Sequence, residues 1–186
     1  KIAALNVHGS LLPQWRGASP MQHTLLHGDA TTGITIQRMV RKLDAGPILG
    51  KVEHVVKDRE TISSLHDSLS VIGTQLLIDI IKNPPEEKDQ DETGVSMCHK
   101  LSRESGAVDP KTMTAIEIDR AVRALVPWPG VKCGVGGAEV KLLETQLEPT
   151  EDSIELPCKD SVLHIIKLQP PGKTAMSGAD FMRGRT

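Results

Sequence analysis

The sequence predicts an α/β protein built from two domains. Strand-like and helical patterns alternate through residues 1–83, a segment rich in proline and charge follows, and short strand-like runs between Gly- and Pro-rich turns fill the rest. The first pattern is typical of sheets covered by helices, and the last suits a small β-barrel. We therefore expect a first domain over residues 1–83, a linker over 84–97 and a second domain over 98–186.

The first domain opens with an apolar strand and a short helix. The apolar run Ile2–Leu5 continues to Val7, which is typical of a strand. Ser19 and Pro20 stand where an N-terminal cap and a first-turn proline belong, so we expect a helix across Met21–His27.

Two further strands and a long helix complete this domain. Ile34–Val40 and Ile48–Val56 have the composition of strands. Apolar residues recur at helical spacing in Thr61–Lys82, which predicts an amphipathic helix that packs on the sheet. These residues are Leu65, Leu69, Ile72 and Leu76. The run Asn83–Glu92 ends the helix, and its prolines and charges predict a solvated linker that needs no function of its own.

The second domain begins with a helix and continues with strands. Thr114 and Glu117 have the spacing of a capping box, and Pro127 ends the helix that they open. The apolar face of this helix consists of Ile118, Ala121, Val122 and Leu125. The β-like runs that follow are Val140–Leu143, Ser153–Leu156 and Val162–Leu168. The sequence Pro-Trp-Pro at residues 127–129 predicts a rigid turn in which the ring of Trp128 covers the barrel.

Composition favours a globular protein of a reducing compartment. Hydrophobic residues make up 38% and charged residues 25% of the 186 positions, and with no Tyr and one Phe the core must be aliphatic. No apolar run approaches roughly twenty residues, so we expect no membrane contact. Cys98, Cys133 and Cys158 lack a Cys-x-x-Cys spacing, which predicts reduced thiols. Cys98 and His99 have no second ligand pair at zinc spacing, so we expect no metal. These features indicate a cytoplasmic location, or alternatively a mitochondrial or plastid matrix.

The charge balance does not favour a strong nucleic-acid binder. The chain has 22 Lys and Arg against 24 Asp and Glu, and residues 98–186 hold twelve of each kind. A typical nucleic-acid-binding protein is more basic. Any RNA contact is therefore expected from a local patch, for which Lys173, Arg183 and Arg185 are the candidates, the alternative being a solvated tail.

Asn6 and His8 form the most informative pair. They are two residues apart at the end of a strand, so their side chains project from the same face. An amide N–H and an imidazole can stabilise a developing oxyanion, and Asp44, folded against His8, could orient the ring or a water that takes a proton. The alternatives are an ordinary turn or a core pair, with Asp44 in a turn before Ala45 and Gly46. A nucleophilic Ser10 is a weaker alternative, because no Gly-x-Ser-x-Gly surrounds it.

The loop after this pair carries apolar and aromatic residues. Leu11, Leu12 and Pro13 offer an apolar wall for a flat heterocycle, or they form a simple hydrophobic turn. Trp15 and Arg16 could hold nucleic acid or a phosphate, but one such neighbouring pair is common on protein surfaces.

From Asn6 to Leu49 the chain resembles the formyltransferases that use formyl-tetrahydrofolate. The motifs that carry this resemblance lie in Asn6–Gly17, Gly28–Ile36 and Leu43–Leu49. The second half is similar to the carboxy-terminal domain of family members that formylate methionyl initiator tRNA. The segments concerned are Lys100–Ser102, Ile118–Ala124, Pro127–Gly130 and Leu168–Ser177.

This resemblance implies a fold and a reaction. The fold is the carboxy-terminal half of a doubly wound, Rossmann-like formyltransferase domain, followed by a small OB-like β-barrel. The reaction is transfer of a formyl group from the co-substrate 10-formyltetrahydrofolate to the amino group of methionyl initiator tRNA in translation initiation, by a monomer. Matched position by position, the catalytic residues are Asn6, His8 and Asp44, and the loop that contacts folate is Ser10, Leu11, Leu12 and Pro13.

The chain begins with Lys1 inside a strand, so we expect the first half of the catalytic domain to precede it.

Three other functions remain open at this point. They are a folate-dependent formyltransferase for a nucleotide or an amino sugar, a formyl-tetrahydrofolate hydrolase, and a non-catalytic RNA-binding remnant. The second-domain motifs disfavour the first and the balanced charge disfavours the last, whereas Asn6, His8 and Asp44 would serve hydrolysis equally well.

Overall fold

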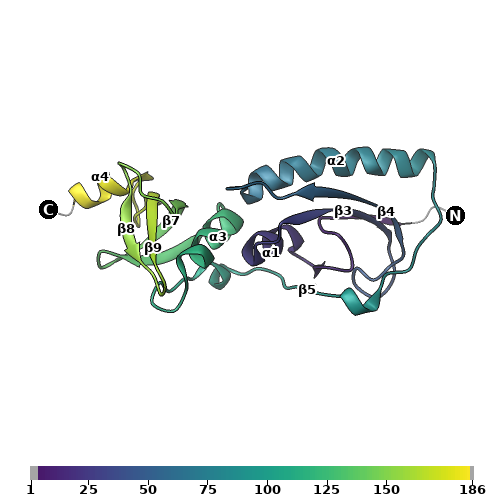
Figure 1. Ribbon diagram of the computed structural model, residues 1–186, viewed down its shortest axis with the longest axis horizontal. Helices are drawn as coiled ribbons and strands as arrows, with labels where there is room; N and C mark the ends of the chain where they lie inside the picture. Colours follow the sequence, from purple (N-terminus) through teal and green to yellow (C-terminus); the bar gives the residue numbers. More distant parts are fainter. Residues whose placement is uncertain (1–3, 185–186) are drawn as a thin grey trace. The chain divides into compact units, whose positions relative to one another are not determined.

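The structure, a computed structural model, describes residues 4–184 (Figure 1). It divides into two compact units, the first ending at Lys100 and the second beginning at Leu101. Each unit has its own antiparallel sheet. No helix within residues 4–184 is both long enough and apolar enough to cross a membrane.

The main sheet of the first unit has three strands. β1 (Leu5–His8), β3 (Thr31–Arg38) and β4 (Ile48–Val55) are arranged in the order β1-β3-β4. A separate parallel pair joins β2 (Arg16–Gly17) to β5 (Met97–Cys98). β3 and β4 confirm two predicted strands with slightly shifted ends, whereas the two-residue strands β2 and β5 were missed because they carry no periodic pattern.

The doubly wound order expected for the first domain is not present within residues 4–100. A doubly wound sheet is mainly parallel, whereas the three strands of the main sheet pair antiparallel. The connection between β3 and β4 explains part of this difference, because it is only the short loop of residues 39–47. A parallel neighbour would need a crossover of about a dozen residues or more. This part of the chain is therefore an α/β unit with an antiparallel sheet.

The long helix α2 (Ile62–Lys82) packs on this sheet and runs along one face over β3 and β4 (Figure 1). The shorter helix α1 (Pro20–His27) contacts α2, and Thr24 of α1 is hydrogen-bonded to Thr32 of β3. α2 can approach the sheet closely because Gly73 has no side chain. A Cβ atom at Gly73 would lie 3.0 Å from Cγ1 of Ile34 on β3. The predicted amphipathic helix is confirmed, because Leu65 and Leu69 are buried and Ile72 and Leu76 are half-buried.

Side chains cap α2 but not α1. Thr61 and Ser64 form a reciprocal capping box at the start of α2. Ser19 occupies the N-cap position of α1 and Pro20 follows it, but the Ser19 side chain makes no capping hydrogen bond. The predicted side-chain cap was wrong because the ψ angle of Ser19 is 52°, outside the extended region that a capping side chain needs.

The second unit combines one long helix with a five-stranded sheet. Its elements are the 3₁₀ turn η2 (Arg103–Gly106), α3 (Ala115–Leu125), β6 (Val131–Val135), β7 (Ala138–Gln146), β8 (Ile154–Pro157), β9 (Val162–Gln169), β10 (Met176–Ser177) and α4 (Gly178–Arg183). The strands pair antiparallel in the order β10-β9-β7-β6, and β8 also pairs with β9. No pairing within residues 101–184 closes the sheet between β6 and β10.

An aliphatic core lies between α3 and this sheet. The predicted capping box of Thr114 and Glu117 is confirmed, and the predicted apolar face of α3 is buried. Alternate residues of β6 are buried, and so are Val140 and Leu142 of β7, as in a half-buried sheet. Trp128 does not cover the sheet as predicted, because it is 55% exposed and aliphatic side chains fill the core without it.

The segment predicted as a solvated linker is partly folded onto the first unit. The 3₁₀ turn η1 (Glu92–Gly94) lies within it, and β5 begins at its last residue, Met97. Lys88 also exchanges two backbone hydrogen bonds with Ile48, of 2.7 and 2.9 Å. Polar composition predicted solvation, but pairing with β2 and with the start of β4 holds the segment in place.

Candidate active site

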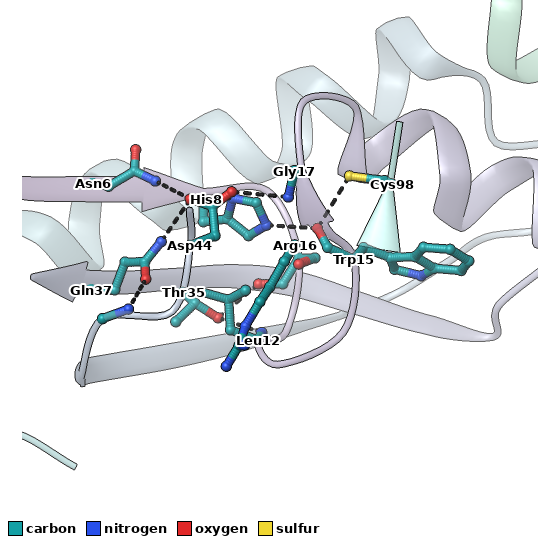
Figure 2. Close-up of polar contacts among 12 residues, drawn as sticks. Asn6, His8, Leu12, Trp15, Arg16, Gly17, Thr35, Gln37, Asp44 and Cys98 are labelled. Atoms are coloured by element: carbon teal, nitrogen blue, oxygen red, sulfur yellow. Dashed lines mark hydrogen bonds and ion pairs between the residues drawn. The ribbon is translucent and has the colours of Figure 1, made fainter. Parts of the chain in front are cut away.

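The carboxylate of Asp44 lies at the centre of a polar network (Figure 2). Its Oδ1 atom accepts hydrogen bonds from Nδ2 of Asn6 at 3.2 Å and from Nε2 of Gln37 at 2.9 Å. Its Oδ2 atom accepts from the backbone N–H of Gly17 at 2.9 Å. The Asp44 side chain is only 9% exposed, so these three donors replace most of its hydration.

His8 lies beside this carboxylate. Its Nδ1 atom is 3.8 Å from Oδ1 of Asp44, and its ring is 5% exposed. Its Nε2 atom is 2.9 Å from the carbonyl oxygen of Trp15. A carbonyl can only accept, so Nε2 carries a hydrogen and Nδ1 is the ring nitrogen that faces Asp44.

The strand geometry explains why these groups meet. Asn6 and His8 are both on β1 and two residues apart, so they share a face, as the sequence predicts. Gln37 of β3 is the direct cross-strand partner of Asn6. Asp44 comes from the loop of residues 39–47, here called the Asp44 loop, which folds back over this face. The structure thus brings Asn6, His8 and Asp44 together and adds Gln37, which sequence reasoning missed.

The backbone of the Asp44 loop is held in an uncommon conformation. Asp44 has a φ angle of 47°, in the left-handed region that non-glycine residues rarely adopt. A glycine is needed two residues later, at Gly46, because a Cβ atom there would lie 1.8 Å from the carbonyl oxygen of Arg38. The N–H of Gly46 donates to Oε1 of Gln37 at 3.2 Å. Gln37 of β3 therefore holds this loop at two points, the Asp44 carboxylate and the Gly46 N–H.

The side chains of Arg16 and Trp15 form hydrogen bonds with other residues of this chain. Arg16 is 1% exposed, and its guanidinium donates to Oε1 of Gln90 and to Glu92. Trp15 donates from Nε1 to Asp29 at 2.7 Å. The nucleic-acid or phosphate grip considered for Arg16 is therefore wrong, since its charge is buried and paired.

Glu92 also accepts from Lys42, at 3.1 Å. The hydrogen bond from Arg16, followed by that from Lys42, lowers the pKa of the Glu92 carboxyl from 4.5 to about 2. The pair of Arg16 and Glu92 connects β2 to the segment that leads into β5.

The loop expected to contact folate is built into the first unit. Oγ of Ser10 donates to the carbonyl of Gln14 at 2.6 Å, so this hydroxyl is not a poised nucleophile. The Thr35 hydroxyl donates to the carbonyl of Ser10 at 2.7 Å and accepts from the N–H of Leu12 at 3.0 Å. Leu12 is fully buried, whereas Leu11 and Pro13 are partly exposed. Leu11 and Pro13 are the side chains of this loop that remain accessible to a flat ligand.

Cys98 shares an acceptor with His8. Its Sγ atom donates to the Trp15 carbonyl at 3.2 Å and accepts from the N–H of Ser19 at 3.4 Å. Burial raises the pKa of the Cys98 thiol. All three cysteines are free, and no cluster of three or more His, Cys, Asp or Glu side chains that could hold a metal ion is found among residues 4–184.

Two of the residues considered for RNA contact, Lys173 and Arg183, belong to the carboxy-terminal part of the second unit. Lys173 and Arg183 are exposed, and Arg183 forms an ion pair with Asp180. Arg185 lies outside the described residues.

Two models of one protein family match the chain. The model described as Formyl transferase matches residues 1–81, and the model described as Formyl transferase, C-terminal domain, matches residues 100–186. Together they account for both units of the structure.

Individual proteins agree with these models. Proteins named methionyl-tRNA formyltransferase from Paramagnetospirillum magneticum and Gluconobacter oxydans are 37% and 36% identical, over 99% and 100% of this chain. The chain spans 64% of the length of each of these relatives. HypX from Aquifex aeolicus in complex with tetrahydrofolic acid has a similar fold, with a TM-score of 0.70 and 17% identity over 96% of this chain and 34% of its own. The structure of a methionyl-tRNA formyltransferase from Clostridium thermocellum has a TM-score of 0.68 and a sequence identity of 15%, over 90% of this chain and 69% of its own.

Proposed function

The chain belongs to the formyl transferase family, and we propose that it transfers a formyl group from 10-formyltetrahydrofolate to the amino group of methionyl initiator tRNA. Two relatives at 36% and 37% identity carry the name of this reaction, and both units of the chain align with them. The fold neighbour from Aquifex aeolicus binds tetrahydrofolic acid, which supports a folate donor.

The observation that carries this proposal is the convergence of Asn6, His8 and Asp44. Formyl transfer forms a bond between the amine nitrogen and the formyl carbon, breaks the bond from that carbon to the donor, and releases a proton from the amine. The donor supplies an activated formyl group. Negative charge collects on the formyl oxygen during attack, so N–H groups aimed at that oxygen lower the barrier.

Asn6 and His8 are the donors available for that oxygen. The Asn6 amide has two N–H groups and donates one of them to Asp44. Its other N–H can meet the formyl oxygen. The Nε2–H group of His8 faces the Trp15 carbonyl, so His8 reaches the formyl oxygen by exchanging one acceptor for the other. Both residues lie next to Asp44, whose Oδ1 atom is 3.2 Å from Nδ2 of Asn6 and 3.8 Å from Nδ1 of His8.

Asp44 has two roles in this proposal. Its carboxylate holds Asn6 and lies beside Nδ1 of His8, which keeps the Asn6 amide and the His8 ring in position. It also orients the water that takes the proton from the attacking amine. Because the carboxylate is already held by the Gly17 N–H, this arrangement exists before substrate binds.

The remaining assignments extend the proposal to binding. Ser10, Leu11, Leu12 and Pro13 form the folate loop, with Leu11 and Pro13 as its accessible apolar contacts. Lys173, Arg183 and Arg185 are proposed to contact tRNA.

We propose that the antiparallel sheet adjoins a doubly wound sheet in the whole domain and that the second unit is an OB-like barrel. We place a monomeric enzyme in the cytoplasm, or in an organelle matrix.

The proposal is tested with an acceptor comparison. The natural full-length protein is incubated with labelled 10-formyltetrahydrofolate and, separately, with methionyl initiator tRNA, an amino-sugar nucleotide, or water alone. We expect label on methionyl-tRNA and almost none on the sugar or in free formate. Preferential labelling of the sugar, or formate release that does not depend on an acceptor, would show that methionyl initiator tRNA is not the acceptor substrate.

A further inference from the structure

Gln90 connects the Asp44 loop to the buried cation of Arg16. Its Oε1 atom accepts from Nε and Nη2 of Arg16 at 3.0 and 2.7 Å. Its Nε2 atom donates to the backbone carbonyls of Asp44 and Gly46 at 2.8 and 2.7 Å. A guanidinium can only donate and a carbonyl can only accept, so these partners fix which end of the Gln90 amide is which.

The backbone of Gln90 is itself held in place. Lys88, two residues earlier, pairs with Ile48 at the start of β4. Glu92, two residues later, accepts from Arg16 at 2.9 Å. The side chain of Gln90 therefore extends from a fixed backbone into the space between Arg16 and the Asp44 loop.

The Asp44 loop needs such a tether. Its first part is exposed, with Met39 59% and Leu43 63% accessible, so packing does little to order it. Asp44 also adopts a left-handed conformation, which persists only where surrounding contacts enforce it. Two of those contacts are the hydrogen bonds that Gln90 makes to the loop's carbonyl oxygens.

We propose that Gln90 is a positioning residue for formyl transfer, acting through Asp44. By holding the carbonyls of Asp44 and Gly46, it sets the place of the Asp44 carboxylate relative to Asn6 and His8. Gln90 touches none of the reacting groups in this scheme. The proposal rests on the proposed function for its effect on rate, whereas the loop contacts themselves can be tested without it.

The competing explanation is that Gln90 only partners buried Arg16. The substitution Gln90→Glu separates the two, because glutamate keeps an oxygen acceptor for Arg16 but has no N–H for the carbonyls of Asp44 and Gly46. The second variant, Gln90→Asn, keeps the amide oxygen and the amide N–H groups, but its side chain is too short to reach both Arg16 and the carbonyls of the Asp44 loop. Gln75→Glu, an identical change on the exposed face of α2, controls for the added charge.

A double-mutant cycle with Asp44→Asn gives the decisive rate measurement. If Gln90 acts through Asp44, Gln90→Glu lowers kcat about 100-fold in the natural protein and less than about threefold in the Asp44→Asn background. The KM for the formyl donor should change little, and Gln75→Glu should leave kcat unchanged. Equal losses of kcat in both backgrounds, or full activity of Gln90→Glu, would overturn the proposal.

Amide hydrogen exchange supplies a readout that does not depend on activity. We expect Gln90→Glu and Gln90→Asn to raise exchange in residues 39–47 and to leave α2 protected as in the natural protein. Unchanged exchange in the loop would overturn the proposal even if the rates fell. If the natural protein formylates no tRNA but loop exchange rises as expected, the proposed function fails while the role of Gln90 in holding the loop stands.

Discussion

The amide of Asn6 donates to the carboxylate of Asp44 over 3.2 Å, although 38 positions separate the two residues in the sequence. This contact depends on the pairing of β1 with β3, because Gln37, directly opposite Asn6, donates to the same oxygen atom. Asn6 is thereby held with one N–H on Asp44 and the other available to a substrate oxygen. The following predictions test this arrangement and the fold that supports it.

Replacing Asn6 removes one proposed oxyanion donor. We expect Asn6→Ala to lower kcat by about 10²–10³ with a smaller change in KM, since such donors act mainly on the transition state. Steady-state kinetics with methionyl initiator tRNA measure the effect. Asn83→Ala, at the exposed carboxyl end of α2, is the matched control and should keep the natural rate. A loss of less than about tenfold for Asn6→Ala would remove Asn6 from the site.

Glu92 contributes stability that depends on pH. Arg16 and Lys42 lower its folded pKa from 4.5 to about 2, so its contribution is present above 4.5 and is lost as the pH falls toward 2. We expect Glu92→Gln to melt at a lower temperature than the natural protein at neutral pH, and the difference in Tm to shrink through this acid range. A difference in Tm that stays constant between these pH values would contradict the assignment.

The cysteines should differ in reactivity. Burial raises the pKa of Cys133 to about 11, so near pH 8 only about one thiol in a thousand is a thiolate. Cys158 is partly exposed, and burial raises its pKa as well. We expect iodoacetamide to label Cys158 before Cys133 in the folded protein, as read by mass spectrometry, and to label both equally in urea. Faster labelling of Cys133 would contradict the burial of its side chain on β6.

The capping box of α3 should be measurable in the stability of the second unit. The Thr114 hydroxyl accepts from the N–H of Glu117, and the Glu117 carboxylate accepts from the N–H of Thr114. We expect Thr114→Ala to cost about 1 kcal/mol of unfolding free energy. Thr174→Ala, at an exposed loop position, serves as the control. Equal urea midpoints for the two variants would show that the cap does not stabilise α3.

The sequence predicted elements whose signal is local. Helical spacing placed α2, the Thr114 capping signal placed α3, and strand-like composition placed β3, β4 and β9. The period of a strand also predicted that Asn6 and His8 share a face. Each of these inferences needs only neighbouring residues, which is why they held.

The missed features depend on contacts between distant segments. Gln37 enters the site through the register of β1 on β3, which no local pattern specifies. Gln90 stands in a charged, proline-rich stretch whose composition predicted solvation, yet it is bound by four residues of the first unit. Arg16 looked like a surface cation because its partners, Gln90 and Glu92, are more than seventy positions away.

The rate of formyl transfer by Asp44→Asn tests the central claim most directly. Asparagine has nearly the same size and tolerates the left-handed conformation, but it removes the charge beside His8 and one acceptor of the network. With melting temperature and circular dichroism unchanged, we predict that kcat for methionyl initiator tRNA falls at least about 100-fold. A folded Asp44→Asn variant whose kcat stays within about threefold of the natural value would contradict catalysis by the Asn6, His8 and Asp44 network.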